Sequence, residues 1–111
     1  MSESTERVQT ADRLWEEHRH DPFPDSLRHA TFAGTHVWLL DLDIAGCVLR
    51  WLDNGGTLDP KNIILLQSRV EDLDRLIPEI DDPTAAEYCQ RLRQLAVLGS
   101  TSTSGTARDA L

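Results

Sequence analysis

The segment from Val37 to Leu52, VWLLDLDIAGCVLRWL, limits the possible folds more than any other part of the chain. At about 100° per residue, the spacing of an α-helix, one face of this segment collects large apolar side chains. These are Leu40, Ile44, Cys47, Val48 and Trp51. Most of the remaining surface is apolar as well, and only Asp43, Gly46 and Arg50 form a polar strip. We therefore expect the central helix of a small helical protein, packed between other helices or shared with another subunit.

Two Asp-Pro pairs predict the starts of two further helices. In Asp59-Pro60 and Asp82-Pro83, the carboxylate can accept from free helix amides, and the fixed φ of proline suits the first helical position. Apolar residues recur at helical spacing after each pair, namely Ile63, Leu66, Val70, Leu73 and Ile77, then Ala85, Tyr88, Cys89, Leu92, Leu95 and Ala96. The central helix that begins near Val37 is expected to end at Asp53-Asn54-Gly55-Gly56. Asn and Gly tolerate the positive φ that is common at the C-terminus of a helix. The sequence predicts three antiparallel helices joined by short loops.

Residues 1–24 are predicted to form an N-terminal arm. The first eight residues are polar and expected to be loose, and a short helix is expected from Ala11 to His20, ended by the prolines that follow. Trp15 and Phe23 are its expected anchors, on the core or on a partner. The arm adds a possible fourth element to the bundle.

The predicted bundle domain covers residues 25–98. Residues 99–111 have no apolar periodicity and are rich in small polar side chains, which predicts a disordered tail. The expected fold class is thus all-α, a small antiparallel three- to four-helix bundle with flexible termini. With 111 residues, the chain has room for one domain of this kind.

Charge and cysteine usage narrow the class of function. The net charge is −8, from 19 acidic and 11 basic residues, so the surface repels phosphate backbones and anionic lipid headgroups. We therefore expect no nucleic-acid and no membrane partner. Cys47 and Cys89 fall within apolar helical patterns, as reduced core thiols do, and no signal sequence or membrane span is apparent. A cytoplasmic protein is expected, and the predominance of Arg over Lys suggests a bacterium with GC-rich coding.

One short motif points toward phosphoryl chemistry. The apolar run that ends in Asp41-Leu42-Asp43 resembles the first motif of the haloacid dehalogenase phosphatases, where a strand ends in Asp-x-Asp. The resemblance implies Asp41 as nucleophile and Asp43 as acid/base. The family pattern has Gly and then Thr or Val after the second aspartate, where this chain has Ile44 and Ala45. The same aspartates begin a calcium-loop pattern, but Leu52 stands where that loop needs a bidentate Glu.

No catalytic constellation or resident cofactor is apparent elsewhere. The four histidines, His18, His20, His29 and His36, lack zinc-ligand spacing and are interpreted as surface or packing residues. The chain has no Gly-rich phosphate loop and no Gly-x-Ser-x-Gly motif. We expect a protein that is not an enzyme and carries no cofactor or metal.

Asp41 and Asp74 are predicted to project toward the apolar side of their helices. An unpaired buried carboxylate costs several kcal/mol, so each needs a cation or a hydrogen-bond donor. Tyr88, Arg91 and Arg93 lie around the apolar face of the last helix and can supply one. We expect Asp41 to pair with one of them and to fix the register of the bundle. The alternative is a polar pocket around Asp41 that binds a small ligand.

The leading functional hypothesis is a non-enzymatic protein-interaction module. A bundle this small cannot readily cover the outer apolar residues of the central helix, which are Trp38, Leu39, Leu42 and Leu49. A homodimer is the simplest way to cover them, and another protein is the alternative partner. A second hypothesis is an acidic immunity protein or antitoxin that neutralises a basic partner. A third is a small-ligand or metal-dependent site around Asp41 and Asp43.

Overall fold

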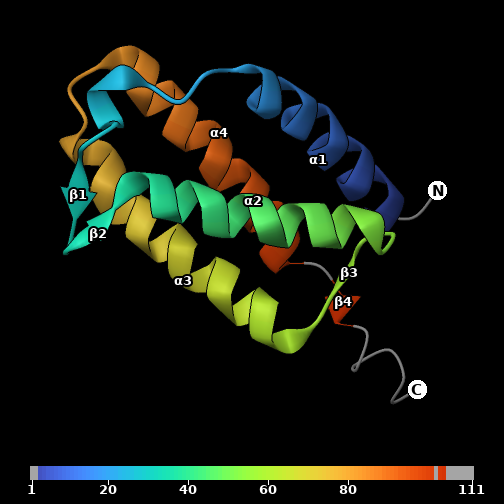
Figure 1. Ribbon diagram of the computed structural model, residues 1–111. Coiled ribbons are helices and arrows are strands. Elements are labelled where there is room, and N and C mark those ends of the chain that lie inside the picture. Colours follow the sequence, from blue (N-terminus) through green and yellow to red (C-terminus); the bar gives the residue numbers. More distant parts are fainter. Residues whose placement is uncertain (1–2, 102, 105–111) are drawn as a thin grey trace.

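The computed structural model describes residues 3–101 and 103–104. This part of the chain is all-α, as predicted. Its helices are α1 (Glu3–His20), α2 (Val37–Asp53), α3 (Pro60–Leu76) and α4 (Pro83–Ser100). In Figure 1, α2 crosses the front of the bundle with α1 above it, α3 below it and α4 behind it. Since α4 contacts all three other helices, it forms the back of a common core.

Short elements make the connections. Between α1 and α2 lie the 3-10 helix η1 (Asp25–Leu27) and an antiparallel hairpin of β1 (Thr31–Phe32) and β2 (Thr35–His36). The strand β3 (Thr57–Leu58) follows α2 and pairs in parallel with β4 (Thr103–Ser104) beyond α4. The 3-10 helix η2 (Ile77–Glu79) extends α3 and precedes the turn into α4. The strands connect segments at the ends of the bundle. Because each strand is only two residues long, they add little to the core.

The core lies where the apolar faces of the helices meet. Every residue predicted for the inner face of α2 is buried in this core, namely Leu40, Ile44, Cys47, Val48 and Trp51. From α3 and α4 come mainly Leu66, Leu73, Ala85, Cys89, Leu92, Leu95 and Ala96. Trp15 and Phe23 pack half-buried against this cluster. No helix in the described residues has the length and apolar character needed to cross a bilayer.

Local sequence signals explain the helix boundaries. Helices α3 and α4 begin at Pro60 and Pro83, the two prolines that predicted their starts. Asp82 caps α4, because its Oδ1 accepts from the Thr84 amide at 3.2 Å. Asp59 makes no such cap, and its Oδ1 accepts from the side-chain amide of Asn62 instead. Helix α2 ends at Asp53, where Gly55 and Gly56 have positive φ as expected.

The first helix is longer than the sequence predicted. Helix α1 begins at Glu3, well before the expected start at Ala11. Its first half is held by tertiary contacts, because Val8 packs beside Gly56 and the Arg7 guanidinium donates to the Thr101 carbonyl at 2.6 Å. These partners lie 48 or more residues away, beyond the reach of a local pattern. A short helix was therefore the wrong expectation for this segment.

The expected tail also differs at its start. Gly99 and Ser100, predicted to belong to a disordered tail, form the last turn of α4. Gly99 is buried against Leu66 and Trp51, so it belongs to the core. Thr103–Ser104 forms the strand β4. The remainder of the predicted tail, residue 102 and residues 105–111, lies outside the described residues.

Candidate functional site

The outer face of α2 carries an exposed apolar stripe. Trp38, Leu42 and Leu49 are 44%, 61% and 42% exposed, high values for side chains of this size. Together with half-buried Ala45 and Leu52, they follow one another in steps of four and three residues. This spacing keeps all five on one side of a helix, and we call them the α2 stripe. Leu39, expected to lie beside them, is half-buried and lies off this line.

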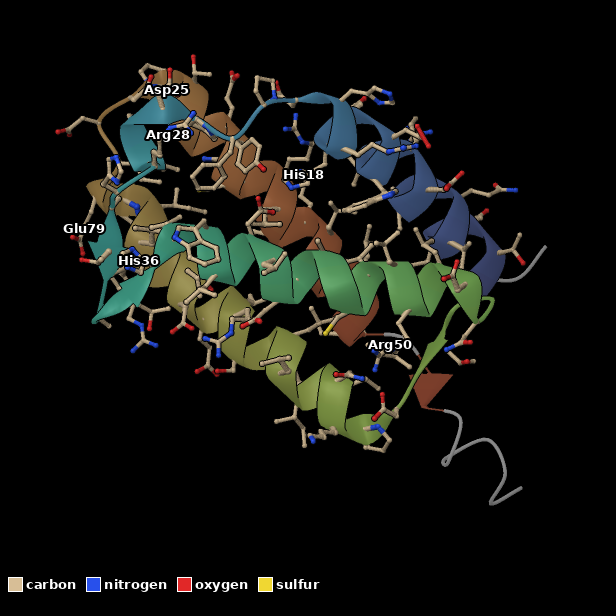
Figure 2. The ribbon with its side chains drawn as sticks, in the orientation of Figure 1. His18, Asp25, Arg28, His36, Arg50 and Glu79 are labelled. Atoms are coloured by element: carbon tan, nitrogen blue, oxygen red, sulfur yellow. The ribbon has the colours of Figure 1, made fainter. Side chains whose placement is uncertain are left out.

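Behind the stripe, Asp41 binds two other helices at once. Its Oδ1 lies 2.9 Å from His18 Nε2 on α1, and its Oδ2 accepts from the Tyr88 hydroxyl on α4 at 2.6 Å. The Asp41 side chain is 18% exposed and that of His18 only 4%. Figure 2 shows His18 projecting from the C-terminal part of α1. The carboxylate therefore joins α1, α2 and α4 at one point.

His18 has a second polar contact, through its other ring nitrogen. Arg91 Nε, which can only donate, points at His18 Nδ1 at 3.4 Å. This contact fits a ring that accepts at Nδ1 and donates from Nε2 to Asp41. Both ring nitrogens of His18 are then occupied. It has no free nitrogen with which to act as a general base.

Aromatic contacts and a second ion pair complete the cluster. The rings of His18 and Tyr88 lie with centroids 4.5 Å apart, and Phe23 meets Tyr88 edge-on at 5.6 Å. The Arg91 guanidinium lies 5.4 Å from the centre of the Tyr88 ring and donates to Asp21 Oδ2 at 2.6 Å. The predicted pairing of Asp41 is thus with Tyr88, while Arg91 contacts the carboxylate only through His18.

Asp74 is a correction to the predicted buried network. Its side chain is 51% exposed and pairs with Arg93, which is 39% exposed, through Nε and Oδ1 at 2.5 Å. This is a surface ion pair between α3 and α4. Asp74 lies at the edge of the apolar face of α3. At such a position a small rotation of the helix decides whether the side chain faces the core or the solvent, which explains the wrong prediction.

Asp41 and Asp43 do not share a site. Asp41 faces α1 and α4, whereas Asp43 Oδ2 lies 3.3 Å from Arg69 Nε on α3. Both lie within a helix, so the motif lacks the strand end that the phosphatase resemblance requires. Among the described residues, no three His, Cys, Asp or Glu side chains gather closely enough to hold a metal ion.

Burial suppresses ionisation of the tyrosine and both thiols. Desolvation raises the pKa of Tyr88 well above its ordinary value of 10.0, and its hydrogen bond to Asp41 raises it further. Burial likewise raises the pKa of the Cys89 thiol to about 11 and that of Cys47 above 9.0. These groups are protonated at neutral pH, so none of them is an activated nucleophile.

His18 is the member of the cluster that the sequence interpretation missed. A signal was present, because Ala11, Leu14, Trp15 and His18 are spaced as one face of a helix. A histidine that is buried on an apolar helix face needs polar partners. Because the histidines lack zinc-ligand spacing, the sequence interpretation places His18 among surface or packing residues and not in the buried polar network.

Comparisons with known proteins give no match for this chain, whether with protein-family models, curated proteins or solved structures. Two structural features remain as guides to function, the α2 stripe and the polar cluster behind it.

Proposed function

We propose that this protein is a non-enzymatic interaction module that self-associates through the α2 stripe. The observation that carries the proposal is the exposure of Trp38, Leu42 and Leu49 along a single helix face. Apolar side chains scattered singly over a surface need no explanation, but a continuous line of them on one element marks an interaction surface. The engagement of both His18 ring nitrogens and the protonated thiols support a role without catalysis.

The spacing of the stripe favours a second helix of the same kind as its partner. Steps of four and three residues give the seam along which two helices pack side by side. Ala45 lies in the middle of the seam and Gly46 beside it, so two backbones can approach closely there. In a twofold dimer, the same patch covers itself on both subunits. A second copy of the chain therefore meets the requirement without any further partner.

The size of the patch sets the expected strength of association. Helix α2 has 17 residues, so it is about 25 Å long at 1.5 Å per residue. A stable interface buries about 800 Å² on each partner, and one helix face needs contributions from its flanks to reach this. We expect a dimer with micromolar affinity.

The two thiols, free and buried, are consistent with a reducing cytoplasmic setting for this protein.

The decisive experiment is sedimentation velocity over a protein concentration series, at low and at high salt. We expect a monomer–dimer equilibrium that changes little with salt, because apolar burial is insensitive to screening. Leu42→Glu places two repelling charges in the seam and should leave the protein monomeric throughout the series. A partnership based on opposite charges, as in a neutraliser, would instead weaken steeply with salt.

Ile64 provides a matched control. It is 64% exposed, like Leu42 at 61%, but lies on α3 outside the stripe. Ile64→Glu adds the same charge to the same overall fold and should leave the dimer intact. The proposal is wrong if the parent chain stays monomeric at high micromolar concentration, or if both variants weaken association equally.

A further inference from the structure

A groove lined with aromatic side chains opens between α1 and α2. Its volume is about 380 Å³, within the range of small-molecule sites. Its lining includes two of the three tryptophans, the only tyrosine and one of the two phenylalanines. These are Trp15, Trp38, Tyr88 and Phe23. Because the face of an aromatic ring attracts a cation, several rings that line one concave place favour a cationic ligand there.

Among the described residues, no Arg or Lys pairs with the Asp41 carboxylate, which lines the same groove. Its two hydrogen-bond partners are His18 Nε2 and the hydroxyl of Tyr88. A carboxylate has about four lone-pair positions, so two of them are still free to accept. With its side chain 18% exposed, Asp41 is largely desolvated yet open toward the groove. A desolvated negative charge without a counter-ion is stabilised by an arriving cation.

The other charges around the groove are already paired. Arg19 lies 3.3 Å from Glu16 on its own helix, and Asp21 accepts from Arg91 at 2.6 Å. These pairs cancel locally, so Asp41 is the carboxylate in the groove lining that no Arg neutralises. Arg91 also lies 5.4 Å from the centre of the Tyr88 ring, so one aromatic wall already holds a cation. The chain's net charge of −8 adds attraction for cations at longer range.

We propose that this groove binds a small alkylated ammonium group, with its charge toward Asp41 and its methyl groups against Trp15, Phe23 and Trp38. Methylated ammonium groups suit such a site, because they are larger and more weakly hydrated than a bare ammonium and fill an aromatic cage. The group can belong to a free small molecule or to a methylated lysine side chain. Both present the same chemistry to the groove.

The test compares choline with 3,3-dimethyl-1-butanol, which has the same shape and no charge. Binding is followed by chemical shift changes in ¹H–¹⁵N spectra, including the indole N–H signals of the tryptophans. We expect choline to shift the signals of Trp15 and Trp38 and to bind at least tenfold more tightly than the neutral alcohol. Equal binding of the two, or binding of neither choline nor the peptide described next, overturns the proposal.

A short peptide carrying trimethyl-lysine, beside the same peptide with unmodified lysine, distinguishes the two sources of the group. Tighter binding of the trimethylated peptide than of choline assigns the groove to a protein side chain. Tighter binding of choline assigns it to a free small molecule. Either result supports recognition of an alkylated ammonium.

Three variants locate the site. Trp38→Leu keeps an apolar side chain but removes one ring, and should weaken choline binding about two- to fivefold. Asp41→Asn keeps the shape and removes the charge, and should weaken it about tenfold, provided its thermal unfolding is still cooperative. Leu49→Ala changes an exposed stripe residue outside the groove and should leave choline binding unchanged. Equal affinity in all three would place the ligand elsewhere.

Trp38, Leu42 and Ala45 belong both to the α2 stripe and to the groove. The titrations are therefore made at a protein concentration where sedimentation shows monomer, and repeated where it shows dimer. Choline binding by the monomer supports the groove whether or not the dimer forms. The two proposals can thus fail independently of each other.

Discussion

The hydroxyl of Tyr88 donates to Asp41 Oδ2 at 2.6 Å, although 47 residues separate the two in the sequence. The other carboxylate oxygen of Asp41 binds His18, 23 residues away in the opposite direction. One side chain thereby fixes α1 and α4 against α2. This matters most for α1, whose residues are largely polar and which buries only a narrow apolar face in the core.

Replacement of Asp41 should be the most destabilising change in the polar cluster. In Asp41→Ala, the His18 Nε2–H and the Tyr88 hydroxyl both lose their acceptor while still largely buried. Each largely buried donor left without an acceptor costs about 1–3 kcal/mol, so the two together should cost roughly 2–6 kcal/mol. Urea unfolding followed by circular dichroism should show this decrease in the free energy of unfolding.

Asp74→Ala is the control for that measurement. It also removes a carboxylate from an interhelical pair, but the pair with Arg93 is about half exposed. Exposed ion pairs contribute roughly 0–1 kcal/mol, so the loss should be small. Similar losses for the two variants would show that Asp41 is not the anchor proposed here.

Alkaline pH should destabilise the fold through Tyr88. In the unfolded chain, its phenol ionises near its ordinary pKa of about 10, whereas burial and Asp41 hold the folded pKa higher. The folded state therefore keeps a proton that the unfolded state loses. Stability is unaffected by this group below pH of about 10 and decreases as pH rises above it.

Near-ultraviolet absorbance can test this directly, because Tyr88 is the only tyrosine in the chain. Tyrosinate should appear together with the loss of helical circular dichroism and not before it. Tyr88→Phe should lose stability at neutral pH but show a shallower decline at alkaline pH. A tyrosine that ionises while the helices persist would contradict the proposed burial.

The two thiols should be protected from modification in the folded protein. Cys47 and Cys89 are 5% and 0% exposed, and burial raises the pKa of Cys89 to about 11. Because the thiolate is the reactive form, Ellman's reagent at mildly alkaline pH should react slowly with the native chain. In denaturant, both thiols should react at the same fast rate. A rapid native reaction of Cys89 would mean that α4 opens locally.

Much of the fold could be predicted because its signals are local. Pro60 and Pro83 mark helix starts, Gly55 and Gly56 mark a helix end, and the inner face of α2 follows from periodicity alone. The true start of α1 could not be predicted in this way, because Val8 and Arg7 are held by residues distant in the sequence.

The polar cluster could be predicted only in part. Asp41 was identified because a carboxylate on an apolar helix is costly, and Tyr88 because its hydroxyl lies on the facing helix. Its partner His18 depends on how α1 is rotated, which tertiary packing decides. The same uncertainty of rotation placed Asp74 on the wrong side of the boundary between core and solvent.

Two helical glycines should respond oppositely to alanine. A Cβ at Gly46 would meet nothing within 4 Å, so Gly46→Ala should gain about 1 kcal/mol from helix propensity. A Cβ at Gly99 would lie 2.7 Å from Leu66 Cδ1. Leu66 is fully buried and has little room to move, so overpacking costing roughly 1–3 kcal/mol should outweigh the same propensity gain.

Thermal and urea unfolding of the two variants, at concentrations where the chain is monomeric, measure this difference. The midpoint should rise for Gly46→Ala and fall for Gly99→Ala. Because both changes add one methyl group to a helix, they share the same intrinsic propensity term, and the difference between them isolates packing. If Gly99→Ala were also stabilising, α4 would have to lie farther from α3 than the contact between Gly99 and Leu66 indicates.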